Sequence, residues 1–149
     1  MSLRGSVDLI ERRADERALR VTDHKTGADR TAAGLVIGNG EVLQPVLYGL
    51  AAEIALGLPV TEGRLFFCTS RGGFAEHAVR LDDAARGAAL NALATIDRGI
   101  AAGFLPPAPR EEACTHCDFR PVCGPYEGER WHRKEQAALA PLAMLRARP

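Results

Sequence analysis

The sequence has no excess of charge of either sign. Its 149 residues include 19 Lys and Arg residues and 19 Asp and Glu residues. A protein that binds nucleic acid through its overall charge is strongly basic, and this balance argues against that class. A local positive stripe remains compatible with the composition.

Long apolar runs are also absent. No run approaches the roughly 18 residues of a membrane span, and no signal peptide precedes the first predicted strand. We therefore expect a cytoplasmic protein without a membrane partner. No Walker motif is present, so any ATPase or helicase must lie in another domain or subunit. There are only four cysteines, and in a reducing compartment three closely spaced ones favour a metal or cluster site over disulfides.

The hydrophobic pattern predicts a mixed α/β sheet flanked by helices. Alternating residues at 4–13 and 18–25, joined by a polar connector at 14–17, predict an antiparallel hairpin. Helical spacing over 43–56 ends at Gly57, with Pro59 just beyond it. Strands are expected at 63–70 and 74–81, and a second helix begins at Asp82 and ends at Gly103.

We divide the chain into a core at 1–109 and a tail at 110–149, which carries three of the cysteines. A last apolar-rich helix at 137–146 has no obvious core to join.

Two acidic residues and a lysine form the first candidate for chemistry. Asp8 lies in the first predicted strand, and Asp23 and Lys25 lie two residues apart in the second, where they share a face. The hairpin can bring Asp8 alongside Asp23, and two carboxylates so close together repel unless a cation lies between them. Mg²⁺ suits this place, with Asp8, Asp23 and the backbone carbonyl of His24 as ligands. The metal would polarise a phosphate and Lys25 would offset charge in the transition state.

The same residues have an ordinary interpretation. Asp-x-Lys is common on exposed strands, and Gln44 and Tyr48, four residues apart on one predicted helix face, are typical of a polar helix surface. The linked pattern favours the functional interpretation, because Asp8 and Asp23 both interrupt runs that otherwise resemble buried strands.

Three segments together carry a family resemblance. They are G-x-V-D-x-I-E from Gly5, V-T-D-H-K-T-G from Val21, and L-Q-x-x-x-Y from Leu43. The set resembles the PD-(D/E)XK nucleases of the RecB and AddB type, with the iron–sulfur CRISPR-associated exonucleases as relatives. The resemblance implies a restriction-endonuclease-like fold, a DNA substrate and Mg²⁺ or Mn²⁺.

Carried over by position, the resemblance assigns metal binding and water activation to Asp8, Asp23 and Lys25. It assigns support of the site and DNA contact to Gln44 and Tyr48. His24 departs from the family, which often has tyrosine there.

Cys114, Cys117 and Cys123 form the pattern C-x₂-C-x₅-C. Such spacing lets a loop wrap several thiolates around one metal centre. His116 or His132 could complete a zinc site, whereas Cys68, in the middle of a predicted strand, is expected in the core. The resemblance implies instead a structural [4Fe–4S] cluster, in which these three cysteines join a fourth that lies upstream of the catalytic motifs in the family.

The resemblance implies a Mg²⁺-dependent deoxyribonuclease that processes DNA ends in double-strand break repair, together with a helicase or ATPase. In the family a helix, often with a functional histidine, precedes the first catalytic strand. We therefore expect this chain to be the C-terminal part of a longer nuclease and to cleave DNA weakly by itself. His77 does not match that histidine and is expected at the surface.

Two alternatives are a non-catalytic DNA-binding or scaffold module of a helicase complex, and a zinc-binding interaction domain.

Overall fold

The computed structural model describes residues 2–12, 17–109 and 113–149, so most of the connector predicted at 14–17 lies outside the described residues. Within the described residues, four strands form one sheet in the order β1-β2-β3-β4. They are β1 (Leu9–Arg12), β2 (Leu19–Lys25), β3 (Val60–Phe67) and β4 (Glu76–Arg80). The β1–β2 and β3–β4 pairs are antiparallel, and the β2–β3 pair is parallel. The predicted mixed sheet flanked by helices is confirmed.

Helix α1 (Gln44–Leu56) connects the two parallel strands, as a crossover between parallel neighbours must. It ends where the sequence predicts, because Gly57 adopts the left-handed conformation (φ 64°) that only glycine adopts without strain. Helix α2 (Asp83–Ala101) begins after Asp82, whose carboxylate accepts a hydrogen bond from the Ala85 amide at 3.0 Å. Single-turn 3₁₀ helices η1 (Gly38–Gly40) and η2 (Ser70–Gly72) lie in the connecting loops.

Helix α1 packs on the sheet face that carries Leu19 and Val21 of β2. Contact is closest at Gly63 of β3, where an added Cβ would lie 2.1 Å from the carbonyl oxygen of Pro45. The helix buries Pro45, Val46, Gly49 and Ala52, and leaves Ile54 87% exposed. The buried side of α1 is therefore made largely of small residues. The spacing of apolar residues in the sequence predicted that Ile54 shares one stripe with Leu43, Val46, Leu47 and Leu50, and this prediction is wrong for Ile54.

The expectation for the last helix is also wrong. Helix α5 (Gln136–Arg146) buries Leu139 and Leu145, and Leu145 joins the core cluster that contains Ile37, Val46 and Ala89. Backbone bonds from the Ile37 and Asn39 amides to the carbonyls of Pro149 and Arg148 attach the segment after α5 to the loop before α1. This segment therefore closes the core of the sheet domain.

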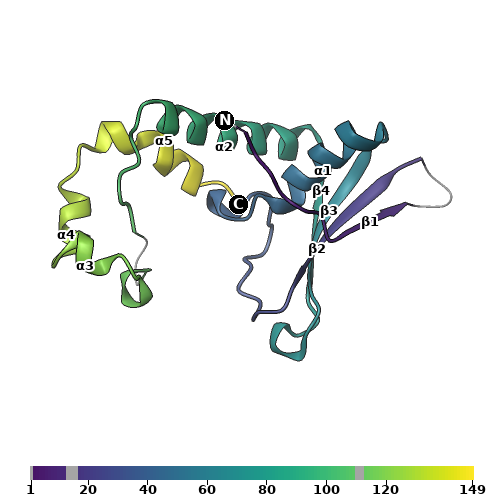
Figure 1. Cartoon of the computed structure of the whole chain (residues 1–149), viewed down its shortest axis with the longest axis horizontal. Coiled ribbons are helices and arrows are strands. Elements are labelled where there is room, and N and C mark those ends of the chain that lie inside the picture. The colour runs from purple at the N-terminus through teal and green to yellow at the C-terminus, as the bar shows by residue number, and fades with distance from the viewer. Residues whose placement is uncertain (1, 13–16, 110–112) are drawn as a thin grey trace.

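The segment that carries three cysteines contains η3 (Ala113–His116), α3 (Arg120–Cys123) and α4 (Glu127–His132). Figure 1 shows α3 and α4 at one end of the long axis of the molecule and β1 at the other. No helix in the described part of the chain is long and apolar enough to cross a membrane.

Candidate active site

Asp8 and Asp23 lie on neighbouring segments of the sheet. The β1–β2 register begins with Leu9 opposite Thr22, and Asp8 is the residue immediately before β1. The side chain of Asp8 is 43% exposed and accepts a hydrogen bond from the His24 amide to Oδ2 at 2.8 Å. This bond fixes the Asp8 carboxylate against the backbone of β2, just beyond the start of β1.

Asp23 and Lys25 share one face of β2, as the predicted spacing requires. Lys25 Nζ lies 2.6 Å from Asp23 Oδ2, and the Asp23 side chain is only 9% exposed. Within the described residues Asp23 Oδ2 is a buried oxygen without a directed hydrogen bond, so its close contact with Lys25 is a charge pairing. A buried carboxylate oxygen that is not saturated by donors can still coordinate a cation.

The backbone of β2 supplies a third oxygen. The Lys25 carbonyl accepts from the Cys68 amide at 3.0 Å and therefore faces β3. Because successive carbonyls of a strand point to opposite edges, the His24 carbonyl faces the β1 edge, where Asp8 lies. Two carboxylates and a backbone carbonyl form the all-oxygen donor set that Mg²⁺ prefers, so these residues fit the metal expected from the sequence.

Gln44 and Tyr48 lie on the neighbouring helix. Gln44 opens α1, whose first turn rests on Gly63, and Tyr48 packs beside the cluster of Leu19 and Val21. The Tyr48 ring lies close to the segment before β1, since an added Cβ at Gly5 would be 3.3 Å from its Cε1. In the described chain no hydrogen bond joins either side chain to the acidic residues, so their predicted roles stay predictions.

Sequence reasoning missed the position of His77. Its ring is 21% exposed, pairs with Asp29 through Nε2 and Oδ2 at 2.7 Å, and meets the edge of Phe67 with ring centroids 5.9 Å apart. Donation from His77 lowers the pKa of Asp29 below its usual value. His77 is therefore a partly buried anchor for the loop that follows Lys25, not the ordinary surface residue that was expected. The β3–β4 register places His77 opposite Leu65, and no local signal in the sequence predicts its distant partner.

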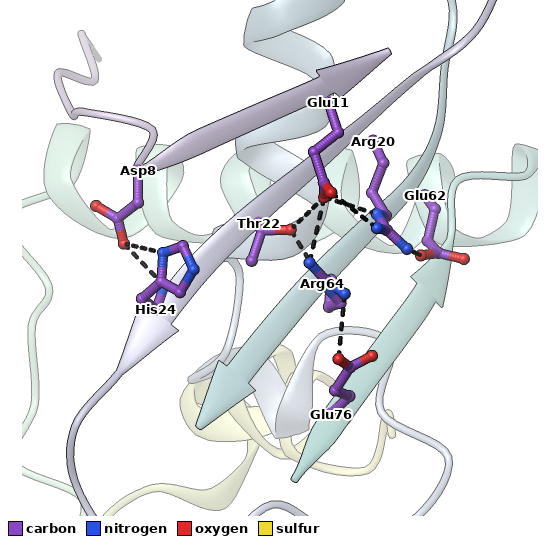
Figure 2. A network of polar contacts seen from close by, with 8 residues as sticks. All are labelled: Asp8, Glu11, Arg20, Thr22, His24, Glu62, Arg64 and Glu76. Carbon is purple, nitrogen blue, oxygen red and sulfur yellow. Dashed lines mark hydrogen bonds and ion pairs between the residues drawn. The ribbon is translucent and has the colours of Figure 1, made fainter. Parts of the chain in front are cut away.

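The opposite face of the sheet carries a second feature that the sequence did not reveal. Glu11, Arg20, Thr22 and Arg64 form a connected set of hydrogen bonds across β1, β2 and β3, which Figure 2 shows beside the Asp8–His24 contact. Such cross-strand pairs are separated by tens of residues, and only the register brings them together.

The cysteines do not assemble a complete metal site. Cys114, Cys117 and Cys123 line one pocket of about 380 Å³. However, no group of three or more His, Cys, Asp or Glu side chains in the described residues is arranged to hold a metal ion. Cys68 is distant from that pocket: it follows β3, and its Sγ donates to the Lys25 carbonyl at 3.5 Å. Neither a [4Fe–4S] cluster nor zinc is supported by this arrangement.

The fold and this site together define an α/β protein with a carboxylate and lysine centre at the edge of a mixed sheet. Comparison with protein families matches residues 1–124 to the PD-(D/E)XK nuclease superfamily. The chain therefore belongs to that superfamily, whose members are generally nucleases and usually use a divalent metal such as Mg²⁺. No curated protein and no solved structure matches the chain.

Proposed function

We propose that this protein hydrolyses phosphodiester bonds of DNA with the help of Mg²⁺ or Mn²⁺, as a nuclease of the RecB and AddB type. The observation that carries the proposal is the buried Asp23 Oδ2, which lies 2.6 Å from Lys25 Nζ on the strand whose His24 amide donates to Asp8. Membership of the superfamily supports the reaction class. The motif resemblance supports the narrower type, its role in processing DNA ends during break repair, and a helicase or ATPase partner.

The proposed ligands of the metal are Asp8, Asp23 and the carbonyl of His24. When bound, the metal supplies positive charge that polarises the scissile phosphate. Asp8 is held in place for this task by the His24 amide, which leaves its second oxygen free of that bond. Lys25 places an ammonium beside the buried carboxylate, where it balances that charge and can stabilise negative charge that develops on the phosphate.

Gln44 and Tyr48 are proposed to support the site from α1 and to contact DNA. All these residues lie within 1–109, the part of the chain to which we assign catalysis. Helices α3 and α4 of the cysteine-bearing tail at 110–149 lie at the other end of the molecule from β1, so we assign no catalytic role to that tail.

The test compares cleavage of a labelled linear DNA duplex by the wild type, Asp23→Asn and Lys25→Met in the presence of Mg²⁺ or Mn²⁺. We expect each substitution to lower the rate by roughly 10²–10³-fold, the usual cost of removing one group that stabilises charge in a transition state. Asp118→Asn makes the same acid-to-amide change at an exposed position in the cysteine-bearing tail and should leave the rate unchanged.

Undiminished cleavage by Asp23→Asn and Lys25→Met would contradict the assignment. Binding of Mn²⁺ and DNA by the wild type without any cleavage would favour a non-catalytic DNA-binding module instead.

A further inference from the structure

Strand β1 is weakly held by apolar contacts. It has four residues, and its two large apolar side chains, Leu9 and Ile10, are 37% and 39% exposed. Pairing register is strongly specified where one face of a strand is buried and weakly specified where it is not. Apolar burial therefore does not explain why β1 lies on β2 in one register.

Glu11 supplies the missing constraint. Its carboxylate accepts from both Nε and Nη2 of Arg20, at 2.9 and 3.0 Å, in the two-pronged geometry that arginine and carboxylate favour. The same carboxylate accepts from Arg64 Nη2 at 3.2 Å and from Thr22 Oγ1 at 3.3 Å. Figure 2 shows these bonds converging on Glu11 from β2 and β3. One side chain of β1 is thus joined to three residues on two other strands.

The partners of Glu11 are themselves fixed. Thr22 is fully buried and also accepts from Arg64 Nε at 3.1 Å. The Arg64 side chain is 12% exposed, pairs with Glu76 at 3.2 Å, and lies over the Phe66 ring. These bonds lower the pKa of Glu11, chiefly through donation from Arg20, so the carboxylate is charged at neutral pH. Each partner of Glu11 therefore has further contacts of its own on β2, β3 or β4, which hold it in position opposite β1.

The register that Glu11 selects is the one that positions the candidate site. With Glu11 opposite Arg20, Leu9 lies opposite Thr22, and Asp8, the residue before β1, accepts from the His24 amide next to Asp23. A slip of one residue would turn Asp8 to the other face, and a slip of two would move it along β2, away from the His24 amide. We infer that Glu11 is a positioning residue, which acts through the β1–β2 register to hold Asp8 beside Asp23 for a shared metal ion. This inference rests on the proposed function for the identity of the metal.

The direct reporter is the His24 amide, because its hydrogen bond goes to Asp8 Oδ2 and needs no metal. The experiment measures amide hydrogen exchange by NMR and Mn²⁺ binding by calorimetry for the wild type, Glu11→Gln and Arg20→Lys. Glu11→Gln keeps the size of the side chain and removes its charge, and Arg20→Lys keeps the charge and removes the two-pronged contact. We expect faster exchange at His24 in both, and a Mn²⁺ concentration for half-saturation that rises roughly tenfold in Glu11→Gln.

Glu62→Gln and Glu76→Gln are the matched controls. Each variant removes one carboxylate from the sheet face that carries Glu11. Glu62 lies 3.5 Å from Arg20 and Glu76 lies 3.2 Å from Arg64, so each control also removes an acidic partner of an arginine that binds Glu11. Neither residue belongs to β1, so both variants should keep wild-type exchange at His24 and wild-type Mn²⁺ affinity. Thermal unfolding of all variants confirms that they are folded.

An unchanged rate of His24 amide exchange in Glu11→Gln would overturn the inference. Equal changes of exchange rate and Mn²⁺ affinity in Glu11→Gln and the two control variants would also overturn it, because they would show a general effect of charge on this face. Should the wild type neither bind Mn²⁺ nor cleave DNA, the proposed function fails, and His24 exchange still decides whether Glu11 sets the position of Asp8.

Discussion

Gly63 is the point where helix α1 and the sheet approach most closely, and we predict that Gly63→Ala strongly destabilises the fold. The new methyl group would lie 2.1, 2.6 and 2.9 Å from the backbone O, C and Cα of Pro45. An ordinary contact begins near 3.4 Å, so the helix would have to retreat by about 1.3 Å. Its first turn buries Pro45 and Val46 and cannot move without opening the core.

The size of the effect follows from these contacts. Overpacking a core costs about 1–3 kcal/mol where side chains can adjust, and here the obstruction is backbone, which places the cost at or above the upper end. A loss of about 3 kcal/mol lowers the melting temperature by roughly 6–12 °C in a domain of this size.

Gly87→Ala is the matched control, and we expect it to stabilise the fold rather than destabilise it. Gly87 lies inside α2, and nothing stands within 4 Å of the position its Cβ would take. Replacing glycine by alanine in a helix interior raises the free energy of unfolding by about 0.8–1 kcal/mol. Circular dichroism during thermal and urea unfolding measures both variants. A melting temperature for Gly63→Ala within 2 °C of the wild type, a margin of about 1 kcal/mol, would refute the account of α1 packing.

Two further predictions concern how the helices are attached. The Arg86 side chain donates hydrogen bonds to the Glu53 carboxylate and lowers its pKa, as does the Val60 amide. Glu53 therefore stabilises the fold above its unfolded pKa of 4.5, and this contribution is lost as the pH falls through the lower, folded value. Glu53→Gln should cost about 1–2 kcal/mol at pH 7 and progressively less as the pH falls below 4.5. Urea unfolding over a series of pH values checks this, and a cost that does not change with pH would contradict the ion pair. Leu145→Ala should cost about 2–4 kcal/mol, because Leu145 is 9% exposed within the core cluster. A loss below about 0.5 kcal/mol, the range of surface substitutions, would show that α5 is dispensable for the fold.

Local signals in the sequence predicted the elements well. Gly57 and Asp82 mark helix ends through backbone conformation and capping, which depend on neighbouring residues alone. The two-residue spacing of Asp23 and Lys25 predicted a shared face for the same reason. These features need no knowledge of the rest of the fold.

Contacts between distant parts of the chain could not be predicted in this way. The α5 helix finds its place against Ile37, and His77 finds Asp29, through packing that no local period records. Ile54 fits the helical spacing but is exposed, because the side of α1 that faces the core carries Pro45, Gly49 and Ala52 instead. Glu11 likewise accepts hydrogen bonds from Arg20, Thr22 and Arg64 only because the strand registers bring these residues together.

The return of α5 to the core has a consequence for the order of folding. Ile37 and Leu145 are more than a hundred residues apart along the chain, whereas the β1–β2 hairpin joins near neighbours. Contacts of low sequence separation form quickly, and distant ones delay the rate-limiting step. The β1–β2 hairpin can therefore pair before α5 has been synthesised, whereas the cluster around Ile37 and Val46 lacks Leu145 until α5 arrives.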